Sequence, residues 1–202
     1  FRSTDVLGEV VDGFYKQYLA LMANSPHRKR SDSLLLINLY GSRPQFRLAN
    51  WPVGWAEAMY RYPYCNGYYE DQQKWYLWII HEAAHQLNRE VAHLKLPLWA
   101  EEGLAAYFST SRYENGSLRF GALDYDTYPL YWYNSYPLAG DEQADIESVA
   151  FIDLRSILSG KGGPDMNLTF NQYYLEWLSL VHFMLHSREG AHREGFSCMV
   201  LG

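Results

Sequence analysis

The segment His81-Glu82-Ala83-Ala84-His85 combines two imidazoles and a carboxylate at a spacing that suits metal chemistry. A helix advances 3.6 residues per turn, so side chains four positions apart project from one face and can hold a single ion. Glu82 then lies about 100° around the helix, where its carboxylate can reach a water at the metal without binding the metal itself. The spacing predicts a metal centre with a general base beside it. The plain alternative is a helix with two incidental histidines.

A third ligand is expected downstream, because catalytic zinc sites commonly have three protein ligands and one open position. Pro97, which is tolerated at a first helical turn, starts a second helix that reads from Leu98 to Phe108. It carries two neighbouring carboxylates, Glu101 and Glu102. Both project from the same turn, so the spacing alone leaves the choice between them open.

These two segments together resemble the gluzincin metallopeptidases. HEAAH followed by PLWAEEGLAAYF is similar in particular to the peptidase-MA-like branch, whose second helix bears Trp-x-x-Glu-Gly-x-Ala-x-Tyr. The resemblance implies that the Glu directly before the Gly, here Glu102, ligates zinc together with His81 and His85. Glu101 remains the competing choice. The pattern also gives Gly103 a role, since a small residue lets the two helices approach closely.

The resemblance extends to three further features. Tyr173 to Trp177 resembles a Tyr-x-x-x-Trp stretch, which implies Tyr173 as the oxyanion donor, while a core stripe is the plain alternative. The stretch 65–69 resembles a Gly-aromatic edge strand to which an extended peptide adds. Some gluzincins place an Asp where this chain has Ala106, so the carboxylate or carbonyl that orients the imidazoles must come from elsewhere.

The predicted function is hydrolysis of peptide bonds in a peptide or protein substrate by metal-activated water. Bound Zn2+ lowers the pKa of a water to about 7 and polarises the substrate carbonyl. Glu82 takes the proton and passes it to the leaving amine, acting as general base and then general acid. One alternative is a catalytically silent module on a zincin scaffold that binds peptide or glycan. Another is a zinc hydrolase that cleaves other amides or esters.

The other histidines are weaker candidates. The metzincin pattern requires Gly and His where this chain has Asn88 and Val91, which excludes that family. His93 lies two turns beyond the motif, too far along the helix axis to share its ion. His182 and His186 repeat the spacing, but only Phe-Met-Leu separates them and no carboxylate adjoins either one. We expect them to be core or surface histidines.

The elements that must position these residues follow from hydrophobic periodicity. Helices are predicted over residues 6–22, 71–93, 98–108, 151–158 and 170–186, the last opened by a capping box of Thr169 and Gln172. Strands are predicted at 34–40, 45–48, 58–62 and 67–69, the first of them buried. Between 109 and 146 the pattern is lost amid tyrosines. This tyrosine-rich stretch is either a pocket wall or lid, or a packed loop.

The whole chain, residues 1–202, is predicted to form a single zincin-like metallopeptidase domain of the α+β class. A small mixed N-terminal sheet in the sheet-rich part, 30–70, precedes the active-site helices, 71–108. The tyrosine-rich loop region, 109–146, and a mainly helical C-terminal part, 147–202, complete the predicted domain.

Composition limits the partners. With 48% hydrophobic and 20% charged residues the chain can bury a core, and its formal net charge of −6 disfavours nucleic acid and anionic lipid. The basic run 27–30 is too short to reverse that sign. No apolar stretch is long enough for a membrane span. Cys65 and Cys198 permit one disulfide without requiring it. The resemblance favours an extracytoplasmic or secreted location, and the oligomeric state stays open.

Overall fold

The computed structural model describes residues 2–21, 35–53, 56–69, 76–114, 117–136, 139–147 and 151–201. The predicted basic run at 27–30 and the start of the predicted helix at 71–75 lie outside these ranges.

The helices are α1 (Arg2–Leu21), α2 (Arg43–Ala49), α3 (Tyr76–Glu90), α4 (Leu98–Ser109), α5 (Glu142–Glu147), α6 (Leu154–Ser159), α7 (Met166–His186) and α8 (Arg193–Leu201). Short 3-10 turns are η1 (Trp51–Val53), η2 (Leu130–Ser135) and η3 (Ser187–Gly190). The strands are β1 (Leu36–Tyr40), β2 (Met59–Arg61), β3 (Tyr64–Tyr68), β4 (Arg112–Glu114) and β5 (Ser117–Arg119). The fold is α+β and mainly helical, which confirms the predicted class.

The N-terminal sheet is small and mixed, with strand order β1-β3-β2. β1 runs parallel to β3, and β2 runs antiparallel to it. Two expectations are corrected. β1 is an edge strand with half-buried side chains and an exposed Leu36, because it pairs on one side. The stretch 65–69 falls in β3, the central strand, because both neighbours pair with it, so the second edge of the sheet is β2.

The predicted strand at 45–48 is wrong, because these residues lie in α2. Pro44 occupies the first turn of this helix, where its missing N–H costs nothing, whereas a strand would need that donor. The helix buries Phe46 completely. Its ring packs against those of Tyr40 and Tyr68, which lie in two adjacent strands. The helix therefore covers the end of the sheet.

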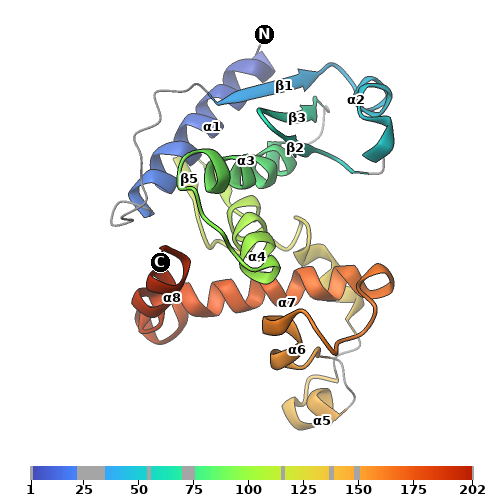
Figure 1. Cartoon of the computed structure of the whole chain (residues 1–202), viewed down its shortest axis with the longest axis vertical. Coiled ribbons are helices and arrows are strands. Elements are labelled where there is room, and N and C mark those ends of the chain that lie inside the picture. Colours follow the sequence, from blue (N-terminus) through green and yellow to red (C-terminus); the bar gives the residue numbers. More distant parts are fainter. Residues whose placement is uncertain are drawn as a thin grey trace.

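Beneath the sheet, α3, α4 and α7 follow one another as successive layers, and α4 lies between α3 and α7 (Figure 1). Two glycines allow the close contacts between the layers. A Cβ on Gly67 would lie 2.6 Å from Ile79 Cγ1, so the missing side chain lets α3 pack directly on β3. A Cβ on Gly103 would lie 2.7 Å from both the Trp177 carbonyl oxygen and Val181 Cγ2. The expected close approach at Gly103 is therefore made to α7 rather than to α3.

Helix α1 packs against both α3 and α4 and completes the core. Its residues Val10, Phe14 and Tyr18 are almost fully buried. The Phe14 ring contacts that of Phe108 on α4 at a centroid distance of 5.2 Å. The Tyr18 hydroxyl donates to Asn88 Oδ1 on α3 at 2.7 Å. These contacts fix the position of the two helices that carry the predicted site.

The tyrosine-rich stretch 109–146 has more structure than its sequence indicates. It contains the antiparallel hairpin of β4 and β5, the turn η2 and the short helix α5. Hairpins and short turns leave no 3.6-residue period, so a periodicity argument misses them.

Helix α7 begins earlier than predicted. Asp165 is its N-cap and accepts a hydrogen bond from the Asn167 amide. Thr169 does not cap the helix but lies inside it with non-helical angles, φ −127° and ψ 23°. Its hydroxyl donates back to the Asp165 carbonyl. The predicted capping box is therefore wrong, although a break in the helix does occur at its position. Helix α6 likewise begins at Leu154 rather than at 151, with Asp153 as its cap.

Both cysteines are free thiols, Cys65 buried and Cys198 exposed, so no disulfide joins them. Within the part of the chain that the structure describes, no helix combines the length and apolarity needed to cross a bilayer.

Candidate metal centre

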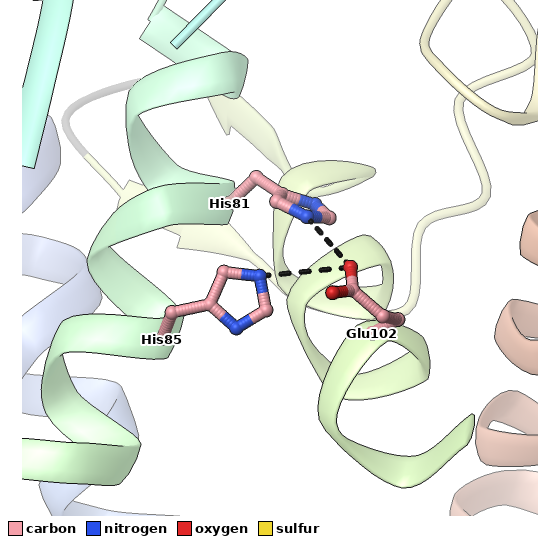
Figure 2. A group of neighbouring side chains, drawn as sticks. All are labelled: His81, His85 and Glu102. Atoms are coloured by element: carbon pink, nitrogen blue, oxygen red, sulfur yellow. Dashed lines mark ion pairs between the residues drawn. The ribbon is translucent and has the colours of Figure 1, made fainter. Parts of the chain in front are cut away.

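His81 and His85 project from one face of α3 toward Glu102 on α4 (Figure 2). The Nε2 atom of His81 lies 3.3 Å from Glu102 Oε2, and the Nε2 atom of His85 lies 3.6 Å from the same oxygen. One ligand atom from each of the three side chains falls within 4.8 Å of the others. Among the described residues, this is the only group of three or more His, Cys, Asp or Glu side chains that could hold a metal ion.

The two separations between the imidazole nitrogens and the carboxylate oxygen suit a tetrahedral ion. Ligand atoms that each lie about 2.0–2.2 Å from a tetrahedral zinc are separated by about 3.3–3.6 Å from one another. The two measured N···O separations, 3.3 and 3.6 Å, fall in that range. The donor set of two imidazoles and one carboxylate is also one that zinc accepts.

Glu101 contacts the other side of His85. Its Oε1 lies 2.9 Å from His85 Nδ1. A carboxylate in this position holds the proton on Nδ1, so Nε2 is the nitrogen that can bind an ion, in exchange for its own proton. Glu101 is therefore placed as the orienting carboxylate that the sequence lacks at Ala106, and Glu102 is the acid that faces both imidazoles. His81 Nδ1 is buried and has no hydrogen-bond partner among the described residues.

The group is strongly coupled electrostatically. Burial lowers the pKa of His85, but the hydrogen bonds with Glu101 and Glu102 and the charge of Glu102 outweigh it and raise that pKa to about 10. Burial raises the pKa of Glu102, but the hydrogen bonds and charges of His81 and His85 outweigh it and hold that pKa well below its usual range. Glu102 is therefore ionised at neutral pH, which is the form that binds a cation.

Glu82 lies beside this group and is held by the sheet. Its Oε2 accepts a hydrogen bond of 2.6 Å from the backbone N–H of Tyr60, on the edge strand β2. The Tyr60 hydroxyl in turn donates to Glu90 Oε1 at 2.8 Å, near the end of α3. The carboxylate of the predicted base is thus fixed between the edge of the sheet and α3.

The structure does not bring Tyr173 to the metal-binding group. Its hydroxyl donates to the Pro164 carbonyl at 3.0 Å, and its ring packs against Trp177 in the core. The next residue, Tyr174, donates to Glu102 Oε2 at 2.8 Å and stacks on the His81 ring at a centroid distance of 6.3 Å. In the structure it is therefore the hydroxyl of Tyr174, and not that of the predicted Tyr173, that lies at Glu102. The sequence shows two adjacent tyrosines, and the rotation of α7 about its own axis determines which of them faces Glu102.

A cavity of about 590 Å³ opens directly beside His81 and Glu82, and both residues contribute to its wall. Much of the lining is aromatic and comes from α3, η2, the segment before it and α7. These side chains are Trp78, Tyr128, Tyr131, Trp132, Phe170 and Tyr174. Part of the tyrosine-rich stretch is thus a pocket wall, as one of the two predictions proposed. The hydroxyl of Tyr128 is buried without a hydrogen-bond partner among the described residues.

The remaining candidate histidines lie elsewhere. His182 and His186 stack on each other with ring centroids 4.5 Å apart, and His186 Nε2 lies 2.9 Å from the Tyr107 hydroxyl. His93 is exposed, after the end of α3, and has a φ of 51°. None of these three belongs to the metal-binding group.

Comparison of the chain with protein-family models, with curated proteins and with solved structures gives no match.

Proposed function

We propose that this protein is a zinc-dependent metallopeptidase with a gluzincin-type active site on a zincin-like fold. The observation that carries the proposal is the convergence of ligand atoms of His81, His85 and Glu102 within 4.8 Å of one another, with both Nε2 atoms 3.3–3.6 Å from Glu102 Oε2. Zinc bound there would polarise a substrate carbonyl and bring the pKa of a water to about 7.

Glu82 acts as the general base and then as the general acid. The Tyr60 N–H on Oε2 fixes the orientation of this carboxylate. The proton of the attacking water is taken up on the carboxylate and delivered to the leaving amine nitrogen, which completes the cleavage of the amide. Because Glu82 also lines the cavity, a substrate in that cavity lies next to the base.

Tyr174 supplies the donor for the negative charge that develops on the substrate carbonyl oxygen. Its hydroxyl already lies at the ligand group, where it donates to Glu102 Oε2. Rotation of this hydroxyl would turn its O–H bond from Glu102 toward the carbonyl oxygen of a substrate bound beside it. The ring of Tyr174 need not move. A donor placed in this way stabilises the transition state more than the ground state.

A catalytically silent module that binds peptide or glycan is the second candidate function. The aromatic lining of the cavity favours it, because such rings bind peptides and sugars without any chemistry. Retention of Glu82 beside the two histidines favours the enzyme, since a binding module has no use for a general base.

The first experiment measures bound metal. We expect the wild-type chain to hold one equivalent of zinc after dialysis, and His81→Ala and Glu102→Ala to lose it. A matched control is Glu114→Ala, which removes an exposed glutamate on β4 and should keep the metal. A wild-type chain that binds no zinc would refute the site.

The second experiment separates the enzyme from the module. Zinc-loaded wild-type protein is incubated with a mixed peptide library and compared with Glu82→Gln, which keeps the size of the side chain but not its basicity. We expect hydrolysis by the wild type and none by the variant, with equal zinc in both. Zinc-loaded wild-type protein that binds peptides but cleaves none would favour the module.

A further inference from the structure

The cavity beside Glu82 continues the proposed active site on the side of the sheet edge. His81 and Glu82 form part of its wall, and Ala58 and Met59, at the start of β2, form another part. Its volume of about 590 Å³ lies within the range of about 300–1,000 Å³ that is usual for ligand sites. A substrate side chain that fills this cavity therefore lies close to Glu82. It must also be larger than a small side chain such as that of Ala.

The lining is suited to an aromatic or similarly bulky apolar group. Tyr131, Trp132 and Phe170 are 43%, 37% and 45% exposed, although each is a large ring at the wall of a single cavity. Trp78 contributes a further ring from α3, which contacts Tyr128 in a tilted arrangement at a centroid distance of 5.2 Å. Burial of such rings against a ligand ring is favourable, and ring pairs add about 0.5–1.5 kcal/mol beyond the buried area.

Charges on the wall of the cavity are largely neutralised. Arg43 and Glu57 form an ion pair there, and Glu57 also accepts a hydrogen bond from the Tyr68 hydroxyl. A substrate cation would therefore have to compete with Arg43 for Glu57. A substrate carboxylate would be repelled by Glu82, which also lines the cavity. An uncharged side chain meets neither obstacle.

We propose that this cavity is the specificity pocket of the enzyme and that it selects a bulky uncharged side chain, best an aromatic one, next to the bond that is cleaved. This inference rests on the proposed function for its cleavage step, whereas the binding preference follows from the cavity alone. Trp132 is the residue assigned to determine specificity, because it is a large, partly exposed ring of the wall and lies on η2, away from the metal-binding group.

The test uses a series of fluorogenic peptides that differ only in the residues flanking one cleavable bond, with Phe, Leu, Ala, Glu or Lys placed on either side in turn. For zinc-loaded wild-type protein we expect kcat/KM to be about 10- to 100-fold higher for Phe than for Ala at one of the two positions. Glu and Lys peptides are expected at or below the level of Ala. In Trp132→Ala the Phe-to-Ala ratio should fall by about tenfold.

The matched control is Tyr133→Ala. Tyr133 is the next residue in the chain and is 47% exposed, but it lines a second cavity on another side of η2. This variant should keep the wild-type Phe-to-Ala ratio. A ratio near one in the active wild type, or an equal fall in both variants, would overturn the inference and leave the proposed peptidase intact.

A binding measurement gives a readout that needs no turnover. Glu82→Gln is titrated with the Phe and the Ala peptide while its tryptophan fluorescence is recorded, because Trp78 and Trp132 both line the cavity. At least tenfold tighter binding of the Phe peptide supports the pocket even if no peptide is hydrolysed by the wild type, an outcome that refutes only the enzyme. Equal or absent binding of both peptides overturns the pocket.

Discussion

Glu101 and Glu102 are adjacent in sequence but contact different atoms of the site. Glu102 Oε2 faces both Nε2 atoms, and Glu101 Oε1 lies at His85 Nδ1. Loss of a carboxylate that orients a metal-binding imidazole typically lowers metal affinity about 10- to 100-fold. We therefore expect Glu101→Ala to weaken zinc binding by that factor, and Glu101→Gln to weaken it less, because its carbonyl oxygen still accepts from Nδ1–H.

Competition with a chromophoric chelator at one fixed pH measures both affinities, with Glu114→Ala as the control that should match the wild type. Complete loss of zinc in Glu101→Ala would instead identify Glu101 as a direct ligand. Unchanged affinity would show that His85 needs no orienting partner.

The tandem tyrosines offer a comparison at a single pair of residues. Tyr174→Phe removes the hydroxyl at Glu102, and we expect kcat to fall about 10²- to 10³-fold with little change in KM. Tyr173→Phe removes only the hydrogen bond to the Pro164 carbonyl, so it should lower the free energy of unfolding by about 1 kcal/mol and leave kcat unchanged. Steady-state kinetics and urea unfolding of both variants check this. The reverse pattern would restore Tyr173 as the donor.

The approach of the two imidazoles could be predicted from sequence because its information is local, whereas the choice of Glu102 over Glu101 came from the family resemblance. His81 and His85 share one helix, so the helical period alone places them together. Which of the two tyrosines lies at Glu102 could not be predicted, because it depends on how α7 is rotated against α4. That rotation is set by the contact of Gly103 with Trp177 and Val181, which lie more than seventy residues away.

At the scale of elements, α4 and α7 meet at Gly103. A Cβ there would lie 2.7 Å from a backbone oxygen of α7, which cannot move aside as a flexible side chain could. We expect Gly103→Ala to destabilise the fold by about 1–3 kcal/mol through this overpacking, although Ala favours a helix. Urea unfolding measures the change.

Gly13→Ala is the matched control within a helix. Nothing lies within 4 Å of a Cβ built on Gly13 in α1, so the same substitution should stabilise the fold there by up to about 1 kcal/mol. Equal effects at the two glycines would contradict the close packing of α4 on α7.

The strand order illustrates what sequence patterns leave undetermined between elements. The pairing of Leu36 with Tyr64 joins two segments that no local period connects, so the central place of β3 follows only from the assembled sheet. The wrong strand at 45–48 has a similar cause. Its short apolar pattern suits either type of element, and Pro44 and the burial of Phe46 favour the helix.

Near the end of α7, His186 makes the stability of the fold depend on pH. Burial, the charge of His182 and the charge of Arg193 lower the pKa of His186. The unfolded chain, with an ordinary histidine pKa of about 6.5, then binds the proton more readily than the folded chain. Folding stability contributed at this site is therefore present above about pH 6.5 and is lost as the pH falls below it.

We expect the loss of stability of the zinc-free protein between pH 7 and pH 5 to be smaller in His186→Gln than in the wild type. Glutamine can still accept from the Tyr107 hydroxyl but takes up no proton. Urea unfolding at both pH values measures the effect, and His93→Gln, at an exposed position, serves as the control. An unchanged pH dependence in His186→Gln would contradict the lowered pKa.

For the whole molecule, the two cysteines report on global packing. Cys198 is exposed on α8, whereas Cys65 is fully buried on β3, and burial followed by the charge of Glu82 raises the pKa of its thiol. We expect a chromogenic disulfide reagent to modify one thiol quickly in the native protein, and the second after unfolding in urea. Cys198→Ser should abolish the fast phase. Two fast thiols in the native protein would contradict the burial of β3.

All three donors of the metal-binding group come from the stretch between residues 81 and 102. Closing so short a loop costs little chain entropy, so these side chains remain within reach of one another when the rest of the chain unfolds. An ion that also binds the denatured ensemble stabilises the native state by less than its affinity alone implies. A zinc ion held here would therefore protect this protein against heat by less than its affinity for the native state implies.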